Sequence, residues 1–248
     1  MRVLVSGLYG HMGREVAALL LKGVEGGQLA AGVSLDIDGS IPVPCSESFK
    51  DADPDVDCII DFSHHSCTKD LMDFAISHDL PVILATTGQT PEEKKMIDDA
   101  AEQIPVFFAA NYSLGVALLI DLAKKAAAVM QDADIEIVET HHNRKLDAPS
   151  GTALAIANAI REVRPGSNII TGRSGYSKRE PGDIGISSVR MGNIVGIHEV
   201  VIATPNQSIT LKHEAFSRAL FAEGALKAAA FLVGQKPGLY DMNSLLTQ

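Results

Sequence analysis

Short apolar runs alternate with amphipathic stretches through the first 112 residues, and this alternation constrains the fold more than any other feature of the chain. Strands are predicted at five places, near residues 2–6, 28–34, 56–61, 81–85 and 105–109. Helices are predicted between them, near residues 11–22, 66–78 and 91–103. Runs such as Val82-Ile83-Leu84 are apolar on both faces of a strand, which is typical of a parallel sheet covered by helices. The pattern predicts an α/β fold with a Rossmann-like, doubly wound parallel sheet.

The start of the third helix is marked by its own residues. Thr90 can cap the helix, Pro91 fits its first turn, and Glu93 completes a capping box. We therefore expect this helix to begin at Pro91.

The pattern changes after residue 113 and predicts an α+β domain inserted into the first. A helix is predicted over 114–130, then a strand over 134–140, a helix over 151–163 and a loop over 171–183. The next three runs are predicted as consecutive antiparallel strands joined by tight turns, at residues 185–191, 194–204 and 207–213. A final helix near 216–233 is expected to pack against the first sheet. The predicted domains are residues 1–112 plus 217–248, and residues 113–216 with an antiparallel or mixed sheet.

Charge and composition exclude several kinds of partner. A net charge of -10 and a pI near 5.2 argue against nucleic acid or an anionic membrane surface, because both require a basic face. No run of about 18 apolar residues predicts a membrane span. The three cysteines form no CxxC pair, which indicates a reducing, cytoplasmic setting.

Three glycines lie where the first strand gives way to the first helix. Gly7, Gly10 and Gly13 are spaced G-x-x-G-x-x-G, shifted by one from the usual dinucleotide fingerprint. Glycine suits this place because a diphosphate must approach the backbone N–H groups at the positive end of the helix. Such a triplet can also be only a tight turn, but the strand before it and the alternation after it favour a nucleotide site.

The choice between NADH and NADPH stays open. An acidic residue at the end of the second strand commonly holds the adenosine ribose, but Ser34 stands there and Asp36 follows two residues later. Either Asp36 reaches the ribose or the site admits a 2′-phosphate, although no arginine follows as its partner. Asp36 and Asp38 can equally belong to a solvated loop.

The carboxyl ends of two further strands carry polar residues. Ala85-Thr86-Thr87-Gly88 follows the fourth strand, where an open parallel sheet binds its ligand. His64 and His65 follow the third strand, but two adjacent histidines without a carboxylate at i+3 or i+4 are more typical of a loop than of metal ligands. No metal site is predicted.

A cationic segment opens the helix at residue 151. His141, His142, Arg144 and Lys145 fall within five residues, and Pro149 with Ser150 starts the helix. The backbone N–H groups and macrodipole at this helix end favour a carboxylate, and a histidine beside an anion can hold and deliver a proton near neutrality. The alternative is a polar surface loop with a capped helix. The segment predicts a site for a small acid.

This segment resembles the 4-hydroxy-tetrahydrodipicolinate reductase family, also called dihydrodipicolinate reductases. The likeness rests on Glu139-Thr140-His141-His142 and on the specific run Lys145-Leu146-Asp147-Ala148-Pro149-Ser150-Gly151-Thr152-Ala153. Other stretches agree in order along the chain: the glycine turn, Asp61-Phe62-Ser63, Thr86-Thr87-Gly88, Asn111-Tyr112-Ser113-Leu114-Gly115, Gly172-Arg173, Ile184-Gly185 and His213-Glu214-Ala215-Phe216-Ser217-Arg218.

The resemblance implies an NAD(P)H-dependent reduction in lysine and diaminopimelate biosynthesis. In the family, hydride passes from the nicotinamide to C4 of a cyclic dicarboxylate, and water is lost from the hydroxylated substrate. The resemblance implies a dinucleotide-binding domain formed by both chain ends, a substrate-binding and oligomerisation domain between them, and a homotetramer.

The resemblance also assigns roles to residues of this sequence. His141 would be the proton donor, and Lys145 would help to bind substrate and assist proton transfer. A substrate carboxylate would be held by His142, Gly151 and Thr152. Contacts to NADH or NADPH would come from Gly7, Tyr9, Gly10, His11, Met12, Asp36, Thr86, Gly88, Ala110, Asn111 and Ser113.

Three positions depart from the family pattern. Ser34 replaces the usual acid, Ile197 stands where glutamate commonly precedes His198, and His65 stands where proline often occurs.

Two other functions are less consistent with the sequence. A short-chain reductase needs Tyr-x-x-x-Lys, which is absent from the sequence. A nucleotide-binding sensor or catalytically idle relative would be expected to have a broken cationic segment, whereas here the segment is intact.

Overall fold

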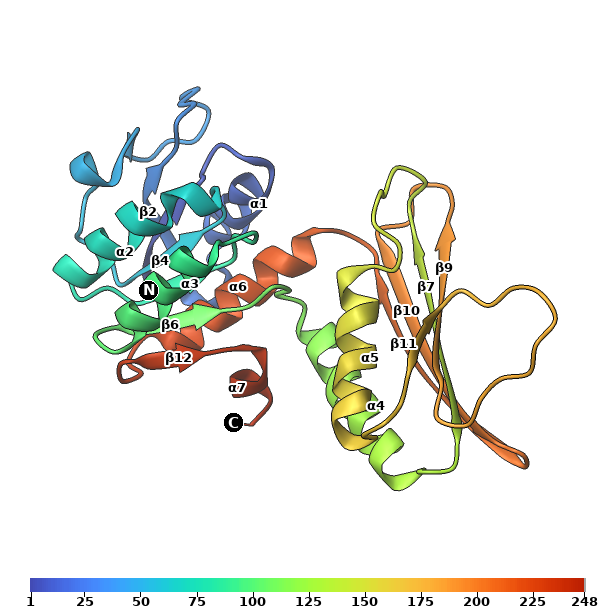
Figure 1. Ribbon diagram of the computed structural model, residues 1–248. Coiled ribbons are helices and arrows are strands. Elements are labelled where there is room, and N and C mark those ends of the chain that lie inside the picture. Colours follow the sequence, from blue (N-terminus) through green and yellow to red (C-terminus); the bar gives the residue numbers. More distant parts are fainter. Residues whose placement is uncertain (248) are drawn as a thin grey trace. The chain divides into compact units, whose positions relative to one another are not determined.

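A computed structural model describes residues 1–247 of the chain (Figure 1). The chain divides into two compact units. One unit joins Met1–Ser113 to the segment that begins at Ala219, and the other comprises Leu114–Arg218. The first unit is therefore built from both ends of the chain.

The first unit contains a seven-stranded sheet in which every pair of neighbours is parallel. The strand order is β12-β6-β5-β4-β1-β2-β3. The order reverses at β1, which lies between β2 and β4, and this is the point where a doubly wound sheet binds ligands. The predicted parallel sheet is confirmed. The strands are β1 (Arg2–Ser6), β2 (Gln28–Val33), β3 (Cys45–Ser46), β4 (Cys58–Asp61), β5 (Val82–Leu84), β6 (Pro105–Phe108) and β12 (Gly238–Tyr240).

Helices pack on both faces of this sheet. Leu4, Ile59 and Val106 join the core cluster formed with the helices α2 and α3. Phe107 points to the opposite face, because neighbouring residues of a strand alternate, and its ring packs edge-on against Phe231 of α6. The helical segments are α1 (His11–Leu20), η1 (Val24–Gly26), η2 (Phe49–Asp51), η3 (His65–Cys67), α2 (Thr68–Ser77), α3 (Pro91–Ala101), α6 (Ala219–Leu232) and α7 (Met242–Leu246).

The predicted capping box at α3 is confirmed. The Thr90 hydroxyl accepts from the Glu93 backbone N–H, and the Glu93 carboxylate accepts from the Thr90 backbone N–H. The sequence prediction missed β3, β12 and α7 here and the strand Ile169–Thr171 of the second unit, because segments of two to five residues are too short to show an apolar period.

The second unit contains a mixed five-stranded sheet with the order β11-β10-β7-β9-β8. Its core unites apolar residues of the sheet with α4 and α5, which contact each other and cover one face (Figure 1). The elements are α4 (Leu114–Val129), β7 (Asp134–His141), α5 (Gly151–Val163), β8 (Ile169–Thr171), β9 (Ile184–Arg190), β10 (Gly196–Thr204) and β11 (Gln207–Ala215).

One predicted pairing in this sheet is wrong. Strands β10 and β11 form the expected antiparallel hairpin. Strands β9 and β10, however, are not neighbours, because β7 lies between them and pairs parallel to β9 and antiparallel to β10. The connection at Gly192 passes over the end of β7, where the Asn143 N–H donates to the Gly192 carbonyl. It is therefore a crossover rather than a hairpin turn.

Strand β7 carries a buried row of alternate side chains. Ile135 and Ile137 face the helices in the core, and the same face continues with Glu139 and His141, which are also buried. The strand thus changes from apolar to ionisable residues without changing face. As a result, two ionisable side chains share the buried, helix-facing side of the sheet.

No helix among the described residues is long and apolar enough to span a bilayer.

The packing of α6 predicts a strong effect of one methyl group. A Cβ added to Gly224 would lie 1.6 Å from the carbonyl oxygen of Tyr112. Tyr112 cannot easily yield, because its hydroxyl hydrogen-bonds the Leu84 and Phe107 carbonyls at 2.9 and 3.0 Å. We expect Gly224→Ala to lower the free energy of unfolding by about 1–3 kcal/mol or more, measured by urea denaturation. Gly151→Ala, where a Cβ meets nothing within 4 Å, is the matched control, and an equal effect in both variants would contradict this account.

Candidate functional site

The glycine turn after β1 is too tight for side chains. Gly7 has φ of 75°, and a Cβ there would lie 2.6 Å from the Phe62 carbonyl oxygen. A Cβ on Gly13 would lie 2.1 Å from the Gly7 carbonyl oxygen. Gly10 is the N-cap of α1 and makes no side-chain cap, so no side chain at that position competes with a ligand for the first N–H groups. The turn has the features that a diphosphate site needs.

A cavity of about 510 Å³ opens beside this turn, at the carboxyl edge of the sheet. The cavity lies where β1, β2 and β4 end, which is the point of reversal in the strand order. Among the predicted cofactor residues, Gly7, Tyr9, Gly10 and Asp36 line it. Their shared wall supports the prediction that this edge holds the adenosine half of a nucleotide.

The end of β2 places Ser34 against the turn. The Ser34 hydroxyl accepts from the Tyr9 backbone N–H at 3.4 Å, and both residues line the cavity. Arg14 of α1 stacks on the Tyr9 ring at 5.3 Å and pairs with Asp38 at 2.5 Å. Hydrogen bonds from Ser40 and Arg14 lower the pKa of Asp38 to about 2. Asp38 therefore holds Arg14 beside this loop, a contact that sequence spacing does not predict.

Buried Asp61 links three loops at this edge. Its carboxyl group accepts from the hydroxyls of Ser63 at 2.6 Å and Thr86 at 2.5 Å, and the side chain of Ser6 also hydrogen-bonds to it. Burial raises the pKa of Asp61, and the hydroxyl contacts oppose that rise. These loops follow β1, β4 and β5, so one carboxyl group joins three strand ends. Asp61 is not among the predicted site residues.

The other predicted cofactor residues also follow strands of this sheet or open α1. His11 and Met12 form the first turn of α1. Thr86 and Gly88 follow β5, and Ala110, Asn111 and Ser113 follow β6, with the Ser113 N–H donating to the Asn111 side-chain oxygen at 2.8 Å. Because β1, β4, β5 and β6 are successive neighbours and all parallel, these loops meet the same edge. None of these seven residues is among those that line the 510 Å³ cavity.

The adjacent histidines make local contacts. The Nδ1 atom of His64 contacts Ser66, and the Nδ1 atom of His65 lies 3.0 Å from the Glu93 carboxylate. Within residues 1–247, no three His, Cys, Asp or Glu side chains are grouped so as to hold a metal.

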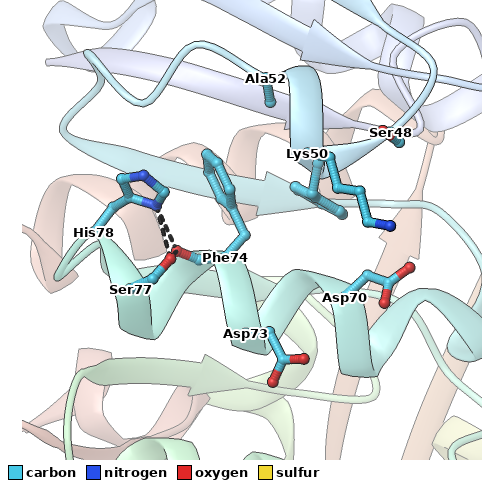
Figure 2. Close-up of a pocket in the computed structure, with 9 residues that line it drawn as sticks. Ser48, Lys50, Ala52, Asp70, Asp73, Phe74, Ser77 and His78 are labelled. Atoms are coloured by element: carbon cyan, nitrogen blue, oxygen red, sulfur yellow. Dashed lines mark hydrogen bonds between the residues drawn. The ribbon is translucent and has the colours of Figure 1, made fainter.

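A second cavity, of about 540 Å³, lies between η2 and α2 (Figure 2). Phe49 and Phe74 pack against each other there at 5.4 Å, and Nδ1 of His78 contacts Ser77 and the Phe74 carbonyl. No residue that the sequence predicted for the cofactor or substrate lines this cavity. The glycine-turn cavity is therefore the better nucleotide site, although it is slightly smaller.

The second unit contains a buried acid–base cluster at the end of β7. The Glu139 carboxylate lies 2.5 Å from Nδ1 of His141 and accepts two hydrogen bonds from Arg190 of β9, at 2.6 and 2.8 Å. The Ser150 backbone N–H donates to the same carboxylate at 3.1 Å. Burial alone would raise the pKa of Glu139, but hydrogen bonds from Arg190, Ser188 and His141 outweigh it and bring the pKa to about 2. Glu139 is thus an ionised carboxylate inside the fold.

His198 of β10 completes the cluster. Its ring lies edge-on to His141 with ring centres 5.2 Å apart, and its Nε2 atom lies 3.1 Å from the Ser150 hydroxyl. That hydroxyl also accepts from the Ala153 N–H, as the cap of α5, so it links His198 to the start of this helix. Burial and the neighbouring His141 lower the pKa of His198 to about 4. His198 is therefore neutral near pH 7.

The cationic segment follows directly. Burial lowers the pKa of His142, and the positive charges of Arg144 and Arg218 lower it further. Its Nδ1 atom is buried and has no hydrogen-bond partner among the described residues. Lys145 pairs with Asp147 at 2.8 Å, and α5 begins at Gly151 and Thr152. The structure brings the predicted substrate residues to one end of the sheet, in a positive field suited to a carboxylate.

Arg190, His198 and Glu139 were not predicted as site residues. Glu139 could have been found, because residues i and i+2 of a strand share a face and His141 was already a candidate. Arg190 and His198 could not, since their place beside His141 depends on the order β10-β7-β9.

The Glu139–Arg190 pair predicts a pH-dependent contribution to stability. The folded pKa of Glu139 is lowered from 4.5 to about 2, so the contribution is complete above the unfolded pKa and is lost as pH falls through the folded one. Near pH 7, Glu139→Gln should lower the free energy of unfolding by about 3–5 kcal/mol, because it leaves a half-buried Arg190 without its carboxylate. Urea denaturation should show this difference shrinking from pH 5 to pH 3.

The control for this experiment is Glu162→Gln, at an exposed ion pair with Lys124. It should change stability by less than about 1 kcal/mol. A Glu139→Gln effect that stays constant from pH 5 to pH 3 would contradict the assigned pKa.

Sequence matches to known proteins extend over nearly the whole chain. The sequence matches the family models described as dihydrodipicolinate reductase, N-terminus, over residues 1–112, and C-terminus, over residues 115–246. The 4-hydroxy-tetrahydrodipicolinate reductase of Caldanaerobacter subterraneus subsp. tengcongensis is 46% identical, covering 99% of this chain and 98% of the relative. The enzyme of the same name from Clostridium novyi is 39% identical, with the same coverage.

Solved structures agree with these matches. A dipicolinate-bound dihydrodipicolinate reductase from Paenisporosarcina sp. TG-14 superposes with a TM-score of 0.81 and 25% identity, covering 98% of each chain. A probable dehydrogenase from Thermotoga maritima, 13% identical, shares the fold with a TM-score of 0.64, covering 98% of this chain and 92% of that one. With both family models matched, this chain belongs to the dihydrodipicolinate reductase family.

Proposed function

We propose that this protein reduces 4-hydroxy-tetrahydrodipicolinate to tetrahydrodipicolinate, with loss of water, at the expense of NADH or NADPH. The reaction belongs to diaminopimelate and lysine biosynthesis. The observation that carries the proposal is the intact cluster at the end of β7, where His141 is held by an ionised carboxylate next to the cationic segment. A catalytically idle relative would have no need to keep both parts.

The substrate proposed is a small dicarboxylate. Dipicolinate, bound by the Paenisporosarcina reductase, is a planar dicarboxylate of this kind. In this chain, His142 offers a buried Nδ1 atom without a partner among residues 1–247, and Arg144 and Arg218 add positive charge around it. A carboxylate placed there would accept from His142 and meet the amino end of α5 at Gly151 and Thr152.

The proton comes from His141 in this proposal. Its side chain is largely buried, and its Nδ1 atom faces Glu139, so Nε2 is the atom available to a substrate. Lys145, partly exposed and paired with Asp147, supplies a further positive charge toward a substrate carboxylate and assists proton transfer. The reaction adds one hydride and one proton and releases the substrate hydroxyl as water, so a single proton donor suffices.

The nucleotide is assigned to the first unit. Residues 1–112 with 217–248 form the proposed dinucleotide-binding domain, and residues 113–216 the substrate-binding and oligomerisation domain. When bound, the reduced nicotinamide supplies the hydride. Gly7, Gly10 and Tyr9 surround the cavity at the start of α1, and the Asp61 contacts fix the loop that carries Thr86. Ser34 in place of an acid leaves room for a 2′-phosphate, while Asp36 lies on the same wall for a ribose.

A homotetramer in the cytoplasm completes the proposal. The helices cover only one face of the second sheet, and the opposite face presents partly exposed apolar side chains. Strand pairing puts these residues on one surface: Val138 of β7, Val189 of β9, and Ile197 and Val201 of β10. We define this set as the open-face patch. Such a patch favours association of identical subunits.

The reaction can be tested by following absorbance at 340 nm. The condensation product of pyruvate and aspartate semialdehyde should cause substrate-dependent oxidation of NADH, NADPH or both, and the two rates rank the nucleotides. His141→Gln should lower kcat by about 10²–10⁴-fold, the usual contribution of a general acid, while nucleotide affinity measured by fluorescence stays within twofold. If the folded wild type oxidises neither nucleotide in the presence of substrate, the protein is better explained as a nucleotide-binding sensor. An unchanged kcat in His141→Gln would contradict the role of His141 as proton donor.

The assembly is tested by light scattering on a sizing column. The wild type should elute with four times the 26.3 kDa chain mass. Val201→Arg, which places a charge in the open-face patch, should give a smaller particle, whereas Val129→Arg on exposed α4 should not. A wild type that runs as a monomer would contradict the proposal.

A further inference from the structure

We propose that Glu139 is the positioning residue of the proton donor, and that together with Arg190 it fixes the Nδ1–H tautomer of His141 and leaves Nε2 to carry the proton. This inference rests on the proposed function, in which His141 delivers that proton. It assigns a role to a carboxylate that has no contact with substrate or nucleotide in the proposed reaction. The inference is carried by the contacts of each carboxylate oxygen.

Every hydrogen-bonding group around the Glu139 carboxylate can donate a proton. The Oε1 atom accepts from Arg190 at 2.6 Å and from the Ser150 N–H at 3.1 Å. The Oε2 atom accepts from the other Arg190 nitrogen at 2.8 Å and lies 2.5 Å from Nδ1 of His141. The side chain is fully buried, so water cannot replace any of these donors. A carboxylate held in this way stays ionised and can only accept.

An acceptor opposite Nδ1 determines which ring nitrogen carries the proton. Neutral histidine has one N–H and one bare nitrogen, and the hydrogen bond of one nitrogen sets the state of the other. Because Glu139 can only accept, Nδ1 must keep its proton, and Nε2 is the nitrogen that gains and loses one. The carboxylate also holds the ring in one orientation during the transfer, without itself taking the proton.

The surroundings of Nε2 are consistent with this assignment. A Cβ on Gly196 of β10 would lie 3.2 Å from Nε2, so any other residue there would crowd this nitrogen. His198 flanks the ring, and burial lowers its pKa, so it adds no competing charge near neutrality. The charged and titratable groups that face His141 are then Glu139, Arg190 and His198, with His142 and Lys145 close by.

The proton balance of the step is simple. The N–H bond at Nε2 breaks, and over the whole reaction this proton leaves with the substrate hydroxyl as water, while a hydride that a bound reduced nicotinamide nucleotide would supply takes the place of that hydroxyl. His141 is left neutral with its proton on Nδ1, still bonded to Glu139. A proton from solvent then restores Nε2–H.

The decisive variant is Glu139→Gln, whose amide can donate to Nδ1 and so favour the opposite tautomer. We expect kcat to fall by about 10²–10⁴-fold, while KM for the nucleotide stays within threefold. Glu139→Asp, which keeps an ionised acceptor, should recover at least tenfold of that loss. Glu162→Gln makes the same chemical change on exposed α5 and should leave kcat unchanged. A wild-type kcat in Glu139→Gln would overturn the proposal.

A second measurement does not depend on activity or on the folding of any Glu139 variant. The chain has eight histidines, so ¹⁵N NMR of the histidine-labelled wild type is tractable, and loss of a resonance in His141→Gln assigns His141. Neutral His141 should show protonated Nδ1 and bare Nε2. The reverse tautomer would overturn the inference. If the wild type oxidises neither nucleotide with substrate, the proposed reaction fails, but the NMR result still decides the tautomer.

Discussion

A single buried carboxylate organises the second unit. Glu139 lies on β7, and its donors come from β9 through Arg190, from the start of α5 through Ser150, and from its own strand through His141. Burying a charge is costly unless every lone pair is satisfied, so each of these elements has one favourable position relative to the others. The loop between β7 and α5 is pinned at both ends by these contacts. The proposed carboxylate site therefore depends on an interaction that never touches a ligand.

The first unit uses a buried carboxyl group for a different purpose. Asp61 also joins three segments, but hydroxyls of serine and threonine surround it in place of an arginine. Burial accordingly raises the pKa of Asp61, whereas Arg190 and the other donors lower that of Glu139. This difference in pKa suits the proposed nucleotide site near Asp61 and the proposed proton donor beside Glu139. A nucleotide diphosphate is repelled by a fixed negative charge, while an imidazolium is stabilised by one.

The spacing of apolar residues and the turn-forming residues were sufficient to predict the parallel sheet, the glycine turn and the capped helix that begins after Thr90. These features depend on residues that are neighbours in the chain. The predictions failed where the structure depends on strand order. Residues 185–191 look like the first strand of a meander, but β7 lies between β9 and β10, and this insertion brings Arg190 and His198 to either side of His141. The sequence alone predicts His141 as the proton donor, which stays a proposal, but it does not predict the groups around His141.

The net charge of the chain is -10, yet the region around His142 is positive. The ion pairs of the second unit show which arginines contribute to this positive field. Arg190 is neutralised by Glu139, Arg173 by Asp183, and Arg179 by Asp134 and Glu136. These arginines therefore hold the fold and contribute little to a field at the substrate site. The field at His142 comes instead from Arg144 and Arg218, which oppose its protonation. A bound carboxylate would remove that opposition, so ligand binding and protonation of His142 favour each other. The fold thus keeps its structural charges and its proposed binding charges on different residues.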